Sequence, residues 1–330
     1  MKRREFIRLL GGGATAWPLL AHAQQTGPAR RVGVLMNSIE ADPEYRAYLA
    51  AFVQGLRTLG WIEGQNLRLD VRWNAGDAER TRISASELLS LSPDVILSSS
   101  TPSLTALLRQ GPAMPIVFTQ VSDPVTQGFV SNLARPGGNI TGFAAYEFSI
   151  GGKWIDLLKQ MVPGLTRVAI VFSPDASPQS KFLLSAVEAT APSLGVEVSA
   201  APVHDAADIG RAVENMSRQP NGGLIVPTDT FLRVHAKLMV ELAARHRVPV
   251  MYFSRFFTEN GGLMSYGTDN ESTFRQAPIY IDRILKGAKP GDLPVQTPTK
   301  FSLVTNVKTA KALGIEVPMI LLLRADDYLE

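Results

Sequence analysis

Cysteine is absent from this 330-residue chain, and histidine is scarce. The lack of cysteine excludes disulfides, thiolate catalysis, thiolate-ligated metals and a lipid anchor on cysteine. After residue 23 only His204, His235 and His246 remain, and no two of them have the spacing of a metal-binding pair. We therefore predict neither a metal nor a cofactor.

Nucleotide-binding and hydrolase motifs are missing as well. The chain has no G-x-x-x-x-G-K-[ST], no G-x-S-x-G, no H-E-x-x-H and no G-x-G-x-x-G on a predicted strand. Asp123 and Asp229 supply two carboxylates for an acid–base enzyme, but no neighbouring residue in the sequence would tune them. An exported enzyme is therefore the least favoured class of function, and we predict that the protein is not an enzyme.

Charge of one sign is not in excess outside the N-terminus. Residues 1–23 carry four basic side chains and one acidic side chain, and the remaining residues carry 29 of each sign. Nucleic-acid binding requires clustered lysine and arginine, which displace counterions from phosphates. We predict no nucleic-acid partner.

The N-terminus has the pattern of an export signal. A basic start, KRRE, precedes a weakly apolar segment that ends in Ala21-His22-Ala23, a typical signal peptidase site. The start resembles a twin-arginine signal, although the general secretory route stays open. The apolar segment is too short for a permanent membrane anchor, and three glycines with Pro18 disfavour a first helix of a cytoplasmic protein. We predict a signal peptide over 1–23 and a periplasmic mature protein.

Strands and helices alternate on both sides of residues 115–143. Apolar strands are expected at 31–36, 67–73 and 94–98, and again at 167–172, 196–200, 223–226 and 249–253, with amphipathic helices between them. Alternation at this spacing predicts right-handed βαβ units and parallel sheets. The fold class is therefore α/β, with two doubly wound parallel-sheet lobes.

The stretch from Pro115 to Phe143 is interpreted as the floor and first hinge segment of a cleft. It begins as a strand, breaks at Ser122-Asp123-Pro124 and resumes as a strand at 140–143. We expect three crossings, near 143, 266 and 300, so that lobe 1 comprises 24–143 with 267–299 and lobe 2 comprises 144–266 with 300–330. A helix is predicted around 274–285, with Pro278 in its first turn or at a kink.

Polar residues gather where the predicted strands end, which is where parallel α/β sheets bind ligands. The candidates of this kind are Asn37, Ser38, Ser99, Ser100, Thr101, Ser122, Asp123, Asp175, Thr228 and Asp229. Ser100 and Thr101 precede a helix, so their hydroxyls either hold a ligand carboxylate, cap the helix, or do both. Asp123 and Asp229 either pair with a ligand ammonium or cap helices.

Aromatic side chains near strand ends and hinges are the second kind of candidate. Tyr146, Tyr252 and Tyr266 are placed to stack on a flat ligand, as are Tyr45 and Phe148, with core or hinge packing as the alternative for each. For Arg255, contact with a second acidic group of a ligand and a surface position are both open.

Six stretches carry a family pattern over nearly the whole mature chain. They are VSDPV at 121–125, LARPGGNITG at 133–142, PTD at 227–229, GGLMSYG at 261–267, IDRILKGAKP at 281–290 and KTAKALG at 308–314. These stretches resemble ABC-transporter substrate-binding proteins of the type I periplasmic fold, in the group that includes binders of tryptophan and other aromatic amino acids. The chain departs from that group at 173–177, at Thr230-Phe231 and in the apolar run 319–323.

The resemblance implies a periplasmic receptor that closes two lobes over a small molecule and presents it to an ABC permease in the inner membrane. We expect this receptor to be a monomer. We expect the ligand to be an amino acid or a related small carboxylate, and aromatic or branched-chain amino acids are the preferred candidates. The alternative function is ligand sensing, in which the ligand-bound protein binds a signalling receptor in the periplasm and not a permease. A cytoplasmic repressor core is disfavoured because no helix-turn-helix precedes Arg31.

Overall fold

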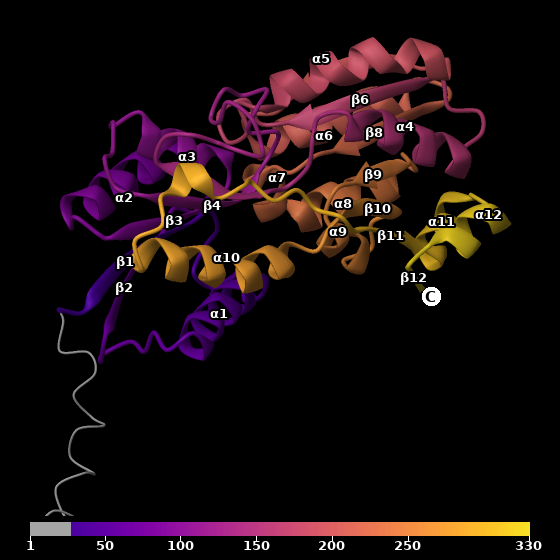
Figure 1. Cartoon of the computed structure of the whole chain (residues 1–330). Helices are drawn as coiled ribbons and strands as arrows, with labels where there is room; N and C mark the ends of the chain where they lie inside the picture. Colours follow the sequence, from indigo (N-terminus) through magenta and orange to yellow (C-terminus); the bar gives the residue numbers. More distant parts are fainter. Residues whose placement is uncertain (1–27) are drawn as a thin grey trace, which may run out of the picture.

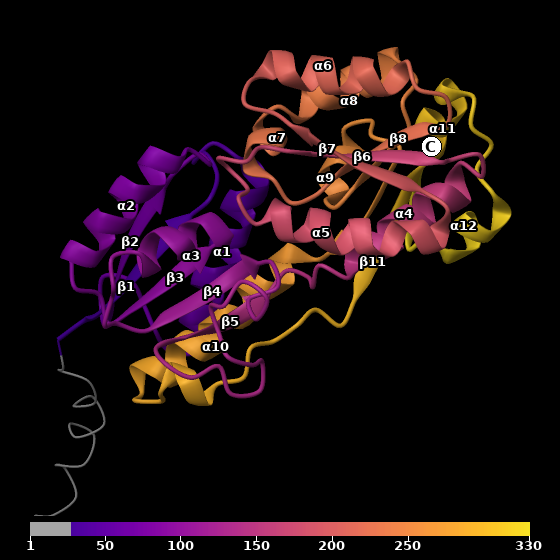
Figure 2. The same cartoon turned by 90° about the horizontal axis from the view of Figure 1, so that it is seen from above.

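The computed structural model of the chain describes residues 28–330. The predicted signal peptide, residues 1–23, lies outside the described residues. The chain forms two lobes that lie side by side (Figures 1 and 2). Across residues 28–330, no helix combines the length and the apolar character that a membrane span requires.

The first lobe is built on a five-stranded parallel sheet in the order β2-β1-β3-β4-β5. Its strands are β1 (Arg30–Met36), β2 (Leu67–Trp73), β3 (Val95–Ser99), β4 (Ile116–Val121) and β5 (Ile140–Ala144). Its helices are α1 (Pro43–Thr58), α2 (Ala78–Ser90), α3 (Thr101–Leu108) and α10 (Asn270–Leu285). Buried apolar side chains of α2 and α3 pack on one face of the sheet, and those of α1 and α10 on the other (Figure 2).

The second lobe is built on a seven-stranded sheet in the order β12-β11-β10-β9-β8-β6-β7. Its strands are β6 (Arg167–Phe172), β7 (Glu197–Pro202), β8 (Gly222–Val226), β9 (Val250–Tyr252), β10 (Met264–Thr268), β11 (Phe301–Asn306) and β12 (Asp327–Leu329). Its helices are α4 (Ile150–Met161), α5 (Ser180–Thr190), the 3-10 helix η1 (Ala191–Leu194), α6 (Ala206–Ser217), α7 (Thr230–Val234), α8 (Ala236–Arg245), α9 (Arg255–Glu259), α11 (Val307–Leu313) and α12 (Met319–Arg324). Helices α4 and α5 cover one face, and α6 and α8 the other (Figure 2).

The predicted class of two α/β lobes with parallel sheets is confirmed, with one difference in the second sheet. Strand β11 runs antiparallel to β10, with Met264 opposite Thr305 and Thr268 opposite Phe301. The reversal arises because the chain leaves β10 for the first lobe and returns from it into β11. Strand β11 therefore enters the sheet from the end at which β10 left it.

The chain passes between the lobes three times. The passages lie between β5 and α4, between β10 and α10, and between the 3-10 turn η2 (Pro290–Asp292) and β11. The first and third passages are joined beside the first lobe: the Ala144 N–H donates to the Gln296 carbonyl at 2.8 Å, and the Gln296 N–H donates to the Gly142 carbonyl at 2.9 Å. A Cβ on Gly142, whose φ is +154°, would lie 2.1 Å from the Phe118 carbonyl oxygen, so this pairing of β4 with β5 requires glycine.

Helix α10 begins earlier than predicted, and the structure excludes the first turn, one of the two positions left open for Pro278. It begins at Asn270, because the Asp269 carboxylate caps it by accepting from the Ser272 N–H at 3.2 Å. Pro278 lies inside the helix and not in its first turn. The proline ring faces α1, where a Cβ on Gly55 would lie 2.6 Å from Pro278 Cγ. The two helices therefore pack closely because Gly55 has no side chain (Figure 1).

Candidate ligand-binding cleft

A small cavity lies between the two lobes, beyond the carboxyl ends of the central strands. It is lined by Asn37, Tyr45, Tyr48, Ser100 and Gln120 of the first lobe, by Pro227, Thr228, Asp229, Thr230, Arg233, Phe253, Ser254 and Phe257 of the second, and by Asn270 at the start of α10. The cavity has a volume of about 40 Å³. That space is on the order of one or two water molecules. The lobes therefore contact each other directly across the cleft.

Arg233 of α7 contacts the first lobe across the cleft. Its Nε lies 3.1 Å from Asp42 Oδ2, and one of its terminal nitrogens lies 2.6 Å from a Glu44 carboxylate oxygen. The guanidinium lies 4.0 Å from the ring centroid of Phe256 and 5.2 Å from that of Tyr45. Burial acts to raise the pKa of Asp42, but the hydrogen bond and charge of Arg233 outweigh it and hold the pKa below its ordinary value. The ion pair is therefore charged at neutral pH.

Asn37 and Thr230 form a second contact between the lobes. The Asn37 Nδ2 group donates to Thr230 Oγ1, while Asn37 Oδ1 is buried without a hydrogen-bond partner among residues 28–330. Gly76 approaches the same threonine so closely that a Cβ on it would lie 2.2 Å from Thr230 Cγ2. Gly76 also has a φ of +69°, which favours glycine. This approach depends on the lobes being closed.

Asp229 both lines the cavity and caps α7. Its Oδ1 accepts from the Leu232 N–H at 3.0 Å, and its Oδ2 accepts from the Ser173 N–H at 2.7 Å. Burial raises the pKa of Asp229 to about 6, although hydrogen bonds from the backbone of Ser173, Leu232 and Phe231 oppose the rise. The predicted helix cap at Asp229 is therefore present, and the same carboxylate lines the cavity.

Ser100, Thr228 and Tyr45 are the other predicted residues that, with Asn37 and Asp229, line the cavity. Ser100 caps α3, since its Oγ accepts from the Ser103 N–H at 3.3 Å, and it has a φ of +102°. The Thr228 hydroxyl is buried and makes no hydrogen bond of good geometry within the described chain. The predicted helix cap at Ser100 is therefore present at the cleft.

Ser38 and Ser99 are buried next to the lining. The Ser38 hydroxyl donates to Asp42 Oδ2 at 3.0 Å, and the Ser99 hydroxyl donates to Gln120 Oε1 at 3.2 Å. They orient Asp42 and Gln120, which contact the other lobe or the cavity.

Tyr146 lies where the first hinge segment passes the cleft. Burial raises its pKa, and the nearby hydroxyls of Ser122 and Thr228 oppose the rise. Ser122 is buried; its N–H donates to Thr101 Oγ1 at 3.2 Å, whereas its own hydroxyl makes no hydrogen bond of good geometry with residues 28–330. These side chains form a polar group at the hinge end of the cleft.

Asp123 and Asp175 do not line the cavity. The Asp123 carboxylate accepts from the Thr126 N–H at 3.1 Å and from the Phe148 N–H at 3.3 Å, so it ties the turn to the hinge. Asp175 is exposed, and its carboxylate lies 3.3 Å from Nδ1 of His204. The structure therefore places these two carboxylates apart from Asp229.

Two of the predicted tyrosines pack elsewhere in the second lobe. Tyr252 is fully buried, with its ring centroid 4.7 Å from that of Phe257. Tyr266 stacks on Phe301 with centroids 5.4 Å apart. Neither ring lines the cavity between the lobes.

Phe148 packs against another ring, and Arg255 lies at the surface, which are the alternatives to ligand contact that the sequence left open for them. The Phe148 ring stacks on that of Phe182, with centroids 5.9 Å apart. Arg255 forms ion pairs with Glu259 at 2.6 Å and with Asp327 at 2.5 Å. Its charge is therefore balanced within its own lobe.

Nine lining residues were not among the sequence candidates: Tyr48, Gln120, Pro227, Thr230, Arg233, Phe253, Ser254, Phe257 and Asn270. Gln120 has a φ of +56°, and strain of this kind accumulates at functional sites. No sequence signal marks that strain. Arg233 follows Asp229 by four residues, a spacing that places both side chains on the same side of a helix. Arg233 could therefore have been predicted from the sequence as a neighbour of Asp229.

The comparisons with known proteins agree with this architecture. A family model described as ABC transporter substrate binding protein matches residues 32–329. The tyrosine-binding protein of Clostridioides difficile strain R20291 is 25% identical over 293 residues, which cover 89% of this chain and 84% of that protein.

Two solved structures share the fold. An ABC domain from Streptococcus pneumonia in complex with L-Trp has a TM-score of 0.82 at 24% identity, covering 91% of this chain and 100% of that one. The ligand-free, open structure of a substrate-binding protein with adhesive properties from Clostridium difficile has a TM-score of 0.66 at 25% identity, covering 92% and 99%. Because the family model spans nearly all of the described residues, the chain belongs to the family of ABC transporter substrate-binding proteins.

Proposed function

We propose that the protein is the periplasmic receptor of an ABC importer and that it binds an amino acid, with aromatic amino acids first. The observation that carries the proposal is the closed cleft, which presents Tyr45, Tyr48 and Phe253 together with polar groups from both lobes. The tyrosine-binding relative and the L-Trp complex support an aromatic ligand. Export to the periplasm rests on the N-terminal sequence, and delivery to an inner-membrane permease rests on the family.

The polar lining suits both charges of an amino acid. In this proposal the ligand ammonium lies near the Asp229 carboxylate and near Asn37 Oδ1, which has no hydrogen-bond partner within residues 28–330. The ligand carboxylate lies near the Ser100 hydroxyl and the side-chain amide of Gln120. An aromatic side chain then packs among the rings, which contribute apolar contact and stacking.

Ligand binding requires the lobes to part and close again. The cavity of about 40 Å³ is far smaller than the sites that hold small molecules, which are roughly 300–1,000 Å³. Rotation about the three hinge segments admits the ligand, and contacts from both lobes then stabilise the closed arrangement. The TM-score with the structure described as ligand-free and open is the lower of the two, 0.66 against 0.82, as expected for a chain whose lobes contact each other across the cleft.

A thermal-shift screen tests the proposal. The purified chain is unfolded and refolded to remove bound ligand and is then mixed with amino acids, aromatic acids, nucleosides or sugars. A ligand at about 1,000 times its Kd stabilises the folded form by about 4 kcal/mol. We expect shifts from aromatic amino acids, because the lining combines rings with groups for both charges.

Matched variants locate the binding. Thr228→Val removes a buried hydroxyl from the lining, and Thr126→Val removes an exposed hydroxyl outside it. We expect Thr228→Val to weaken binding about tenfold and Thr126→Val to leave it unchanged. Shifts from sugars or nucleosides alone, or equal affinity in both variants, would contradict the proposed ligand and site.

A further inference from the structure

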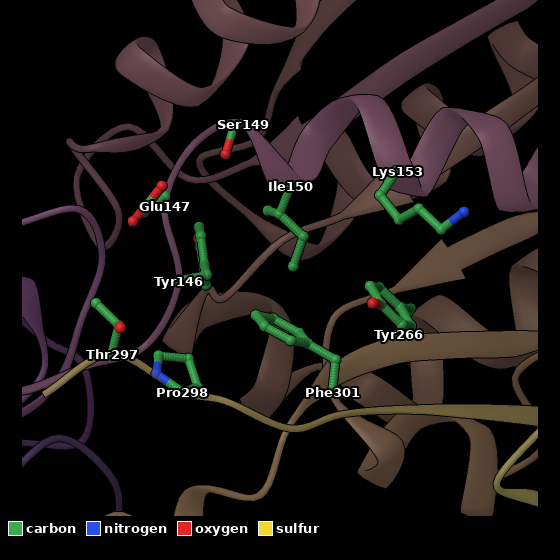
Figure 3. A pocket seen from close by; sticks show the side chains of 9 residues that line it. All are labelled: Tyr146, Glu147, Ser149, Ile150, Lys153, Tyr266, Thr297, Pro298 and Phe301. Atoms are coloured by element: carbon green, nitrogen blue, oxygen red, sulfur yellow. The ribbon is translucent and has the colours of Figure 1, made fainter.

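A second cavity, of about 390 Å³, shares no lining residue with the cavity between the lobes, although one of its residues, Tyr146, lies at the hinge end of the cleft. It is lined by Tyr146, Glu147, Ser149, Ile150, Lys153, Tyr266, Thr297, Pro298 and Phe301 (Figure 3). Its volume is within the range of sites that bind small organic molecules. No part of the amino-acid proposal uses it.

The cavity is formed where two hinge segments separate. The first and third passages are hydrogen-bonded at Ala144 and Gln296, beside the first lobe. The first then enters α4 and the third continues into β11, and the cavity lies between them in the second lobe. Backbone angles in such hinge segments change when lobes part, so the shape of this cavity depends on the arrangement of the lobes.

Apolar side chains form the wall of the cavity. Ile150 points from α4 toward Phe301, which points back from the start of β11 (Figure 3). Tyr266 stacks on Phe301 at an interplanar angle of 19°, and its carbonyl accepts from Trp154 Nε1 at 2.9 Å. The wall is therefore held in place by contacts with the core, and it offers aromatic surface to a ligand.

The charges at the rim are unequal. The Lys153 ammonium lies 2.6 Å from an Asp156 carboxylate oxygen, so its charge is already balanced. Glu147 is exposed and forms no ion pair with any residue between 28 and 330. One carboxylate that forms no ion pair with the described residues thus shares the cavity lining with Ile150, Tyr266 and Phe301, a combination that favours an organic cation through charge attraction and an aromatic body through ring contact.

We propose that this hinge cavity is a second binding site, which takes a small organic ammonium ion with an aromatic or apolar body. The body packs against Ile150, Phe301 and Tyr266, and the ammonium group lies at the Glu147 carboxylate. Because the two lining segments join the lobes, binding here is thermodynamically linked to closure whenever the closed and open cavities differ in affinity.

Titration of the full chain with phenethylammonium tests this site, with 2-phenylethanol and phenylacetate as neutral and anionic analogues of similar size. Calorimetry gives the affinity, and amide chemical shifts of labelled protein give the location. We expect phenethylammonium to bind about fivefold or more tightly than either analogue, with shifts at residues 146–153 and 297–301. Equal affinity for the neutral analogue, shifts confined to the cleft, or no binding would overturn the proposal.

Two glutamate variants provide the matched comparison. Glu147→Gln removes the carboxylate at the rim, and Glu188→Gln removes an exposed carboxylate of α5 that also forms no ion pair with the described residues. Both side chains are exposed, so both variants are expected to fold. We expect about fivefold weaker phenethylammonium binding in Glu147→Gln only. Equal affinity in the two variants would overturn the assignment of Glu147.

Discussion

Arg233 and Asp42 form an ion pair across the cleft, although 191 positions separate them in the sequence. Their side chains are only 11% and 12% exposed, so solvent and salt screen the pair weakly. Asp42 also caps α1 by accepting from the N–H groups of Glu44 and Tyr45. The pair thus joins the start of α1 in one lobe to α7 in the other, and it stabilises the closed arrangement.

Replacing Arg233 with methionine should open the lobes. The change leaves the Asp42 carboxylate in the closed cleft without its counter-charge, and such a loss costs about 3–5 kcal/mol in a buried pair. Opening lets water reach Asp42 and avoids much of that cost. We expect a larger radius of gyration by small-angle X-ray scattering without ligand.

The control for this opening is Arg211→Met. Arg211 pairs with Asp208 on the surface of α6, and its side chain is 60% exposed. Surface pairs contribute little, so the radius of gyration should not change. A radius for Arg233→Met that equals those of the control and the wild type would contradict the role of the pair in closure.

A side chain at Gly76 should hold the lobes apart. In Gly76→Ala the new Cβ would lie 2.2 Å from Thr230 Cγ2, and the φ of +69° adds about 1–2 kcal/mol of backbone strain. We expect ligand affinity to fall about tenfold or more, because each ligand contact depends on closure. Calorimetry with the ligand found by the thermal-shift screen measures the loss.

The variant Thr230→Ser distinguishes the steric clash with the Thr230 methyl group from the backbone strain at position 76. It removes Cγ2 and keeps the oxygen that accepts from Asn37. In the Gly76→Ala background it should recover part of the affinity, since the methyl clash is relieved while the backbone strain and the contact with Cβ persist. No recovery would show that the loss does not come from this contact.

Asp229 should make stability depend on pH in a defined window. Its folded pKa of about 6 is above the ordinary value of 3.8, so the folded protein binds this proton more tightly than the unfolded chain does. The stabilisation is complete below pH 3.8 and is lost as the pH rises through about 6. Relative to Asp229→Asn, the free energy of unfolding of the wild type should fall by about 3 kcal/mol across this window.

Urea unfolding of the wild type and Asp229→Asn at several pH values measures this difference. The lowered pKa of Asp42 gives the opposite dependence, with stability lost as the pH falls, and it acts below the Asp229 window. A difference that is constant from pH 3.8 to 6 would rule out the raised pKa of Asp229.

The contact between Gly55 and Pro278 should limit substitution at α1. A Cβ at Gly55 would lie 2.6 Å from Pro278 Cγ, so Gly55→Ala is expected to cost about 1–3 kcal/mol through overpacking. Gly210→Ala in α6 is the matched control, since its Cβ would meet no atom closer than 4.0 Å. That change should stabilise the protein by about 0.5–1 kcal/mol through helix propensity.

Adding Pro278→Ala to Gly55→Ala should recover part of the loss, because the smaller side chain makes room for the new methyl group. Denaturant unfolding of the wild type, Gly55→Ala, Pro278→Ala and the double variant gives the change in free energy of unfolding for each substitution and the coupling between them. If the changes in free energy of unfolding were additive, a steric contact between residues 55 and 278 would be contradicted.

The sequence by itself determined the fold class and the positions of the polar strand ends. Apolar strands that alternate with amphipathic helices can bury their apolar faces in only a few arrangements. Among these arrangements, short connections allow parallel βαβ units. Asn37, Ser100, Thr228 and Asp229 line the cleft because residues that follow parallel strands meet at one edge of a sheet.

Only the tertiary structure decided which of these polar residues face the other lobe. Asp123 and Asp229 both follow an apolar strand, yet the first binds hinge amides and the second lines the cavity. The Arg233 pair and the contact of Gly76 with Thr230 join residues far apart in the sequence. Such contacts depend on the rotation of one lobe against the other, and local propensity and periodicity carry no information about that rotation.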